Sequence, residues 1–254
     1  MDKNYYKDYY HLERHNWWFT VRSKILAERI KASCQSPKDL HILNVGVATG
    51  ATSEMLGQFG EVMSVEYDRE CYEFTKSILS TPIINGSILE LPFANNSYDL
   101  VCAFDVIEHV KDDAKAVAEM VRVCKPNGWI VVTVPTFMSL WGQHDVINHH
   151  YKRYVMPELV QLFNTHHGKI LYQSYFNSLL FPPIYAFRNL MRVLPKNLFR
   201  KKDGVGSDHD IIHQDSFVNQ VLETVFSIEK KLLHHNITFP VGVSAVIVWQ
   251  KNIL

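Results

Sequence analysis

Short apolar runs alternate with helical patterns along the first 135 residues, and this alternation constrains the fold more than any other feature of the chain. The runs predict five strands: 41–45 (HILNV), 61–66 (EVMSVE), 81–85 (TPIIN), 98–104 (YDLVCAF) and 129–135 (WIVVTVP). Strands that are apolar along their whole length are buried on both faces, as in parallel sheets covered by helices. The sequence therefore predicts an α/β fold with a Rossmann-like, doubly wound, mostly parallel sheet.

The second half of the chain continues the sheet less regularly. Two later runs, 169–176 (KILYQSYF) and 241–250 (VGVSAVIVWQ), predict further strands. Apolar residues at helical spacing predict helices over 11–33, 69–79, 112–124, 157–167 and 214–234. Residues 136–156 are expected to form a loop. Because no linker divides the chain, a single domain over 1–254 is expected.

Charge and cysteine content exclude several classes of function. Lys and Arg together number 26, as do Asp and Glu, so the chain has no basic field that would attract nucleic acid. The cysteines are far apart and form no CxxC pair, which argues against a zinc knuckle or a redox pair; they are Cys34, Cys71, Cys102 and Cys124. Reduced thiols, a first segment unlike a signal peptide and the lack of a long apolar run predict a cytoplasmic protein without a spanning helix.

The loop after the first predicted strand suits a small ligand group. Gly46 is followed by Ala48 and Ala51, so a dinucleotide fingerprint is incomplete, and the lysine of a P-loop is missing. Small residues still let a ligand approach the backbone, and the helix that begins after Gly50 offers free N–H groups. A carboxylate fits these donors better than a pyrophosphate does.

An acidic residue ends the second predicted strand. Glu66 lies at its carboxyl end, where a carboxylate can accept hydrogen bonds from both hydroxyls of a ribose. The expected ligand therefore combines a ribose with a small anionic group.

Four segments in order resemble the motifs of class I S-adenosylmethionine-dependent methyltransferases. They are ILNVGVATG, VEYD, LELPFANNSYDLVCAFDVIEHV and VCKPNGWIVVTVP, and together they cover roughly residues 40–135. The resemblance implies S-adenosyl-L-methionine as cofactor and a seven-stranded sheet whose last strand is antiparallel. It further implies an N-terminal helical lid (1–35), a cofactor-binding core (36–135), an acceptor loop and cap (136–235) and a final strand (236–254).

The resemblance also implies a set of cofactor-binding residues. Gly46 and Gly50 would line the methionine end, Glu66 would hold the ribose, and Tyr67 and Ile88 would flank the adenine. The complete expected set is Asn44, Gly46, Ala48, Gly50, Glu66, Tyr67, Ser87, Ile88 and Phe104.

Three positions depart from the family pattern. Asn44 stands where an acid is usual, Ala48 replaces the middle glycine, and Ser87 replaces the acid that contacts the adenine amine. These departures motivate an alternative function, a non-catalytic scaffold or binding protein with a weakened cofactor site. A nucleotide-dependent oxidoreductase is disfavoured because the required glycines are missing.

The stretch HDVINHHYKRY carries the expected catalytic residues. His144, Asp145 and His150 lie close in sequence, and an imidazole titrates near neutral pH, as a general base requires. The alternatives are a structural network and a metal site. The metal site is disfavoured, and no metal is predicted, because no strand or helix spacing organises three ligands. Lys152 and Arg153 either bind an acidic acceptor or are solvated.

The acceptor is expected to be a small molecule or a saccharide with a free hydroxyl. The same stretch resembles a bacterial subgroup associated with polysaccharide and glycoconjugate synthesis. Residues 175–202 are apolar and basic, without an acid. Such a segment could lie at the inner membrane surface, beside a lipid-linked glycan, or cap the acceptor pocket, and the cap is the favoured interpretation.

Overall fold

A computed structural model describes residues 3–34, 38–193 and 217–253 of the chain. Within them lies a seven-stranded sheet with the order β3-β2-β1-β4-β5-β7-β6. The strands are β1 (Leu40–Val45), β2 (Gly60–Glu66), β3 (Ile83–Asn85), β4 (Tyr98–Phe104), β5 (Cys124–Pro135), β6 (Gly168–Phe176) and β7 (Ser244–Lys251). The last strand, β7, runs antiparallel to both of its neighbours. This confirms the predicted fold class.

The described helices flank the strands. They are α1 (Lys3–His15), α2 (Trp17–Ser33), α3 (Ala51–Leu56), α4 (Arg69–Lys76), α5 (Asp113–Val123), α6 (Gln143–Ile147), α7 (Met156–Asn164), α8 (Phe181–Val193) and α9 (Phe217–His234), with 3-10 turns η1 (Ile107–His109) and η2 (Met138–Leu140). The single helix predicted over 11–33 is two helices. The break falls at Asn16, whose side chain accepts a hydrogen bond from the N–H of Trp18 and so caps α2.

The prediction of a loop over 136–156 was wrong in part, because η2 and α6 lie within it. The carboxylate of Asp145 accepts a hydrogen bond from the N–H of Gly142 at 2.7 Å and holds the first turn of α6. A helix of five residues with one buried position leaves no amphipathic period in the sequence.

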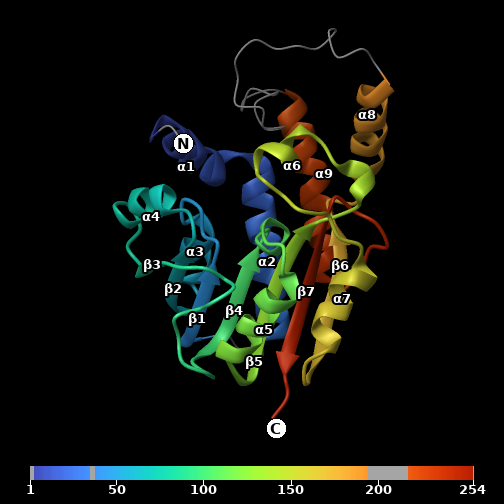
Figure 1. Ribbon diagram of the computed structural model, residues 1–254. Coiled ribbons are helices and arrows are strands. Elements are labelled where there is room, and N and C mark those ends of the chain that lie inside the picture. Colours follow the sequence, from blue (N-terminus) through green and yellow to red (C-terminus); the bar gives the residue numbers. More distant parts are fainter. Residues whose placement is uncertain (1–2, 35–37, 194–216, 254) are drawn as a thin grey trace.

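Helices cover both faces of the sheet (Figure 1), and a hydrophobic core lies on each face. On one face α5 and α7 contribute buried side chains such as Met120 and Phe163. On the other face α2, α3 and α9 contribute Ile25, Leu56 and Phe226. The sheet is thus covered on both sides, as the apolar strands require.

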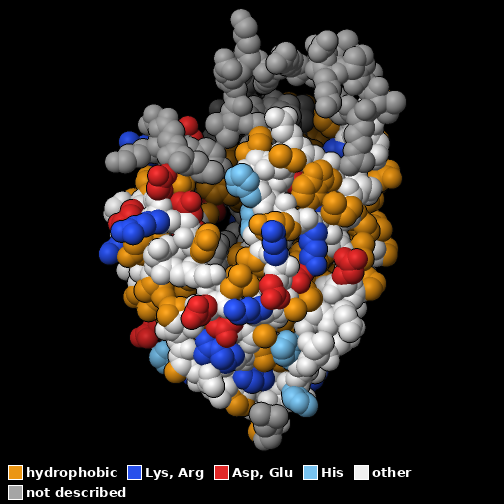
Figure 2. Space-filling view, viewed as in Figure 1, with side chains coloured by type: hydrophobic (Ala, Val, Ile, Leu, Met, Phe, Trp, Pro, Cys, Tyr) orange, Lys and Arg blue, Asp and Glu red, His pale blue; other side chains and the backbone are white. Residues whose placement is uncertain are grey.

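The parallel strands direct the site to one edge of the sheet. The carboxyl ends of β1, β2, β4 and β5 meet at the edge beyond which α1, α6 and α8 lie, and the C-terminus lies at the opposite edge (Figure 1). Side chains of both charges are mixed over the face shown in Figure 2. No helix among the described residues is both long and apolar enough to cross a bilayer.

Candidate active site

The loop after β1 brings its backbone to the open edge through three residues with positive φ. These are Gly46 (φ 68°), Ala48 (φ 46°) and Gly50 (φ 92°). A Cβ atom at Gly46 would lie 2.5 Å from a methyl carbon of Val106, so no side chain fits there without a shift. Gly50 is the N-cap of α3. The predicted glycines therefore serve the path of the loop, and Ala48 adopts a conformation that favours glycine.

Glu66 turns its carboxylate toward this loop. Oε2 accepts a hydrogen bond from the N–H of Ala48 at 2.9 Å, and Oε1 accepts one from the N–H of Asp68 at 3.0 Å. The residue is 8% exposed, and burial raises its pKa against the opposing effect of the two N–H bonds. Each oxygen has a further lone pair, so the carboxylate can also accept the two hydroxyls of a ribose. The arrangement fits an adenosyl group.

Asn44 uses its amide group in the fold. Its Nδ2 donates hydrogen bonds to the hydroxyls of Thr52 at 2.8 Å and Ser53 at 2.9 Å, which ties the start of α3 to β1. Its buried Oδ1 has no hydrogen-bond partner among the described residues. Asn44 therefore holds the α3 hydroxyls rather than the loop backbone.

The other expected cofactor residues differ in exposure. Tyr67 is 77% exposed, whereas Ile88 and Phe104 are buried in the two cores. Ser87 accepts a hydrogen bond from the N–H of Leu89 at 3.2 Å and stabilises a turn. Tyr67 is thus the expected residue whose ring stands free to cover a ligand.

Helix α1 lies against the loop after β1. Arg14 donates to the carbonyl oxygen of Thr49 at 3.1 Å and pairs with Glu54 at 2.6 Å. Glu13 accepts a hydrogen bond from the Thr49 hydroxyl, and burial raises the pKa of Glu13 to about 7. Sequence reasoning missed both residues, because nothing in a polar helix indicates which turn reaches a loop 35 residues later.

A buried ion-pair network organises the stretch after β5. Asp145 is fully buried and accepts hydrogen bonds from Nδ1 of His150 at 2.9 Å and Nε of Arg153 at 2.8 Å. Burial opposes ionisation of Asp145, but the bonds from His150 and Arg153 outweigh it and hold its pKa well below the usual range. With Nδ1 donating to Asp145, the Nε2 atom of His150 is left as an acceptor. His144 lies beside it, with ring centroids 5.9 Å apart.

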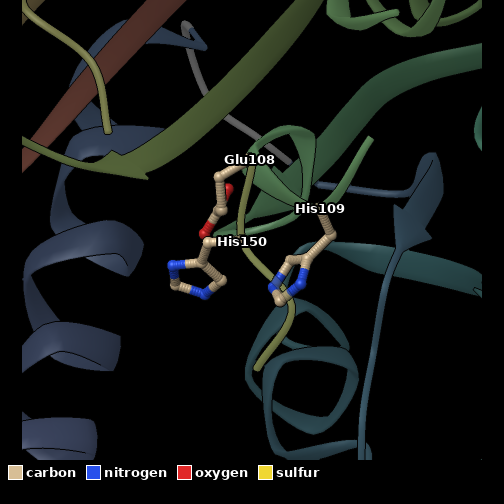
Figure 3. Close-up of side chains that lie close together, drawn as sticks. All are labelled: Glu108, His109 and His150. Atoms are coloured by element: carbon tan, nitrogen blue, oxygen red, sulfur yellow. The ribbon is translucent and has the colours of Figure 1, made fainter. Parts of the chain in front are cut away.

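Glu108 and His109, from η1, complete a cluster with His150 (Figure 3). The His109 and His150 ring centroids are 4.5 Å apart. Burial, reinforced by the charge of Asp105, raises the pKa of Glu108 well above its usual range. Desolvation and the neighbouring His150 lower the pKa of His109 to about 4. Sequence reasoning missed Glu108, although its position after β4 at the carboxyl edge was a usable signal.

The two basic residues after His150 have internal partners. Arg153 pairs with Asp145, and Lys152 pairs with Asp113. Arg153 is buried, so it is not the solvated charge that was one of the expectations, whereas the Lys152 side chain remains 40% exposed. The two ion pairs connect the segment to α6 and α5.

Comparison with known proteins finds a methyltransferase domain in the chain. A family model described as a methyltransferase domain matches residues 43–132, from β1 to β5, and includes the loop that carries Gly46 and Gly50. The chain is an S-adenosylmethionine-dependent methyltransferase. Its cofactor is S-adenosylmethionine.

Relatives of this methyltransferase include enzymes with a named substrate. Demethylmenaquinone methyltransferase of Staphylococcus aureus (strain MRSA252) is 29% identical over 170 residues, which cover 61% of this chain and 68% of the relative.

Solved structures with the same fold cover nearly the whole chain. One, from the complex between the Haloferax volcanii Trm112 methyltransferase activator and a methyltransferase, has a TM-score of 0.59 at 12% identity and covers 99% of this chain and 95% of its own. Another, an S-adenosylmethionine-dependent methyltransferase of Thermotoga maritima, has a TM-score of 0.55 at 16% identity. The match covers 98% of this chain and 96% of the Thermotoga protein. At these identities the structures show the fold alone.

Proposed function

We propose that this methyltransferase moves the methyl group of S-adenosylmethionine to a hydroxyl of a small-molecule acceptor. The bound cofactor supplies an activated methyl group, and the protein has to align the acceptor and remove its proton. The observation that carries the proposal is the 2.9 Å bond between His150 and Asp145 at the carboxyl edge of the sheet. A scaffold function is not favoured, because Glu66 keeps the orientation that ribose binding needs.

The cofactor half of the site is assigned to the loop after β1 and the end of β2. Glu66 accepts the ribose hydroxyls with its remaining lone pairs. Gly46 and Gly50 leave room for the methionine part, and Tyr67 and Ile88 lie on either side of the adenine. Ser87, next to Ile88, is the residue placed to bond the adenine amine.

The acceptor half is assigned to the stretch after β5. Asp145 fixes the ring of His150 and selects the tautomer in which Nε2 accepts a proton. His144 stands beside this ring and contacts the acceptor. The pair is the general base that removes the proton of the hydroxyl as the methyl group is transferred.

The proposed acceptor carries its hydroxyl on a ring, and two sources fit this chemistry. The subgroup resemblance of the His-rich stretch favours a saccharide hydroxyl, and the relatives named for demethylmenaquinone favour a quinone. A saccharide hydroxyl and the reduced form of a quinone each carry an O–H proton that a general base can remove. Parallel assays with labelled cofactor and with either glycan precursors or reduced quinones separate the two sources.

A peripheral membrane contact through 175–202 is part of the proposal. In the described part of this segment Tyr185, Phe187 and Leu190 of α8 are between 41% and 57% exposed. Phe181, at the start of α8, packs against Phe137, so this end acts as the cap over the acceptor side. The basic residues 196 and 200–202 lie outside the described residues. Flotation with anionic vesicles tests the contact, and failure to float removes it.

Replacing the base tests the proposed chemistry. His150→Ala should lower the rate of methyl transfer roughly 10²–10⁴-fold, the usual contribution of general base catalysis. The variant should fold, because Arg153 and the N–H of Gly142 still bond Asp145. His144→Ala should reduce the rate less. Affinity for S-adenosylhomocysteine should not change in either variant, and full activity in both would remove the base from the account.

A further inference from the structure

Glu108 carries a carboxyl group that is fully buried. Neither carboxyl oxygen has a hydrogen-bond partner in the part of the chain that the structure describes. Buried polar groups are nearly always paired, because leaving one unpaired costs its full desolvation free energy. A ligand held at this carboxyl would supply such a partner.

The nearby cations are engaged elsewhere. Arg22 bonds Asp105 and Thr133, and Arg153 bonds Asp145 and the carbonyl oxygen of Thr136. The charges of both guanidinium groups favour ionisation of Glu108, but burial outweighs them and raises its pKa.

Two imidazoles stand next to this carboxyl. One donor atom each from Glu108, His109 and His150 lie within 4.8 Å of one another, and the two rings are nearly perpendicular, at 88°. In Figure 3 the carboxylate of Glu108 points toward the ring of His150, and His109 lies beside it. Two imidazole nitrogens and one carboxylate are the donor set that binds Fe²⁺ and related ions with open positions left over.

His150 has a carboxylate behind its ring, as metal-binding imidazoles usually do. Nδ1 of His150 donates to Asp145, which is itself fixed by Arg153. A carboxylate behind an imidazole sets its tautomer and orientation and increases its basicity toward an ion. The ligands come from η1 and from the segment after α6, so the site forms only in the folded chain.

We infer that Glu108, His109 and His150 form a binding site for a divalent transition-metal ion. Such ions bind carboxylate and imidazole donors at about 2.0–2.2 Å. The sequence predicted no metal, because it considered ligands within the His-rich stretch, where His144 and Asp145 are adjacent. The structure supplies two of the three donors from η1, 41 residues before His150 in the case of His109 (150 − 109).

The inference bears on the proposed function through one atom. An ion at this site occupies Nε2 of His150, which is the atom proposed to take the proton of the acceptor. The loaded protein then lacks that base, so metal binding and base catalysis exclude each other in one molecule.

Titration with Co²⁺ tests the site without the acceptor. The full chain, freed of metal with a chelator, should take up one equivalent of Co²⁺ with new visible absorption bands, and Zn²⁺ should displace it. Glu108→Gln and His109→Ala should each weaken binding by more than the roughly 10–100-fold loss typical of an outer partner, because each removes a direct ligand. His149→Asn is the matched control, because His149 is a neighbouring exposed imidazole outside the cluster, and Asn tolerates its positive φ. This variant should bind as the wild type does.

Two results would overturn the inference. One is the absence of saturable Co²⁺ binding in a chain that still binds S-adenosylhomocysteine. The other is equal binding by wild type, Glu108→Gln and His109→Ala, which would mean an adventitious ion only. The proposed site of S-adenosylhomocysteine is at Glu66, away from the metal cluster. Its binding in the same samples therefore separates failure of the metal site from failure of the proposed function.

Discussion

At the scale of single residues, the site depends on side chains whose neighbours fix their direction. The two N–H groups that bond Glu66 set its carboxylate toward the loop, and Asp145 sets the ring of His150. Both anchors are backbone or buried groups, so their positions are determined before any ligand binds. This preorganisation reduces the cost of binding and of aligning the reacting atoms.

Gly46→Ala should destabilise the protein by about 1–3 kcal/mol. The new Cβ clashes with Val106, and the alanine must adopt a left-handed backbone conformation. A second substitution, Val106→Ala, in the Gly46→Ala chain should restore the part of the stability that is lost through the clash. Gly57→Ala is the matched control, since Gly57 has a helical φ of −56° and an added Cβ has more room. Chemical denaturation measures the free energy of unfolding. Equal stability of both alanine variants would contradict this role of Gly46.

At the scale of elements, helix α1 and the loop after β1 form one unit through Arg14 and Glu13. Glu13 has a folded-state pKa of about 7, above the value of 4.5 for an unperturbed carboxyl. Between these two pH values the unfolded chain loses the proton while the folded chain keeps it. Stability therefore falls as pH rises through this window, and the loss persists above it.

Glu13→Gln should remove this part of the pH dependence. The variant should lose less stability than the wild type between pH 4.5 and 7, because glutamine does not ionise and can still accept the Thr49 hydrogen bond. Denaturation series at several pH values compare the two chains. Parallel curves for wild type and variant would show that Glu13 is ionised in the fold.

The elements that sequence could predict are those with a strong period. The strands are apolar runs buried on both faces, so β1, β2 and β4 were found almost to the residue. The fifth strand was predicted from residue 129, whereas β5 begins at Cys124. The missed part contains a bulge, because the pairing passes from Cys124 to Trp129 across two residues of β4.

The site could be predicted where a motif is local and not where it joins distant segments. Glu66 was found because an acid at the end of β2 is a local pattern. Glu108 was missed because its importance comes from burial beside His150, 42 residues later (150 − 108). Likewise nothing local shows that Arg153 is buried against Asp145. These relations arise from tertiary packing.

At the scale of the whole molecule, cofactor binding should stabilise the fold. S-adenosylhomocysteine at 100 times its dissociation constant should add about 2.7 kcal/mol to the free energy of unfolding. For a chain of this length that corresponds to a rise in melting temperature of roughly 5–10 °C. Thermal unfolding with and without S-adenosylhomocysteine measures this rise in melting temperature. No shift at saturating concentration would support the scaffold alternative instead.

The most direct measurement is calorimetric titration of S-adenosylhomocysteine into wild type and Glu66→Ala. The lost ribose bonds, at about 1–3 kcal/mol, should weaken binding by roughly tenfold or more. Tyr6→Phe is the matched control, because it removes a hydroxyl that bonds Asp68 nearby while Glu66 keeps its own bonds. The account predicts that Glu66→Ala loses affinity and Tyr6→Phe keeps it. Unchanged affinity in a folded Glu66→Ala would contradict the account.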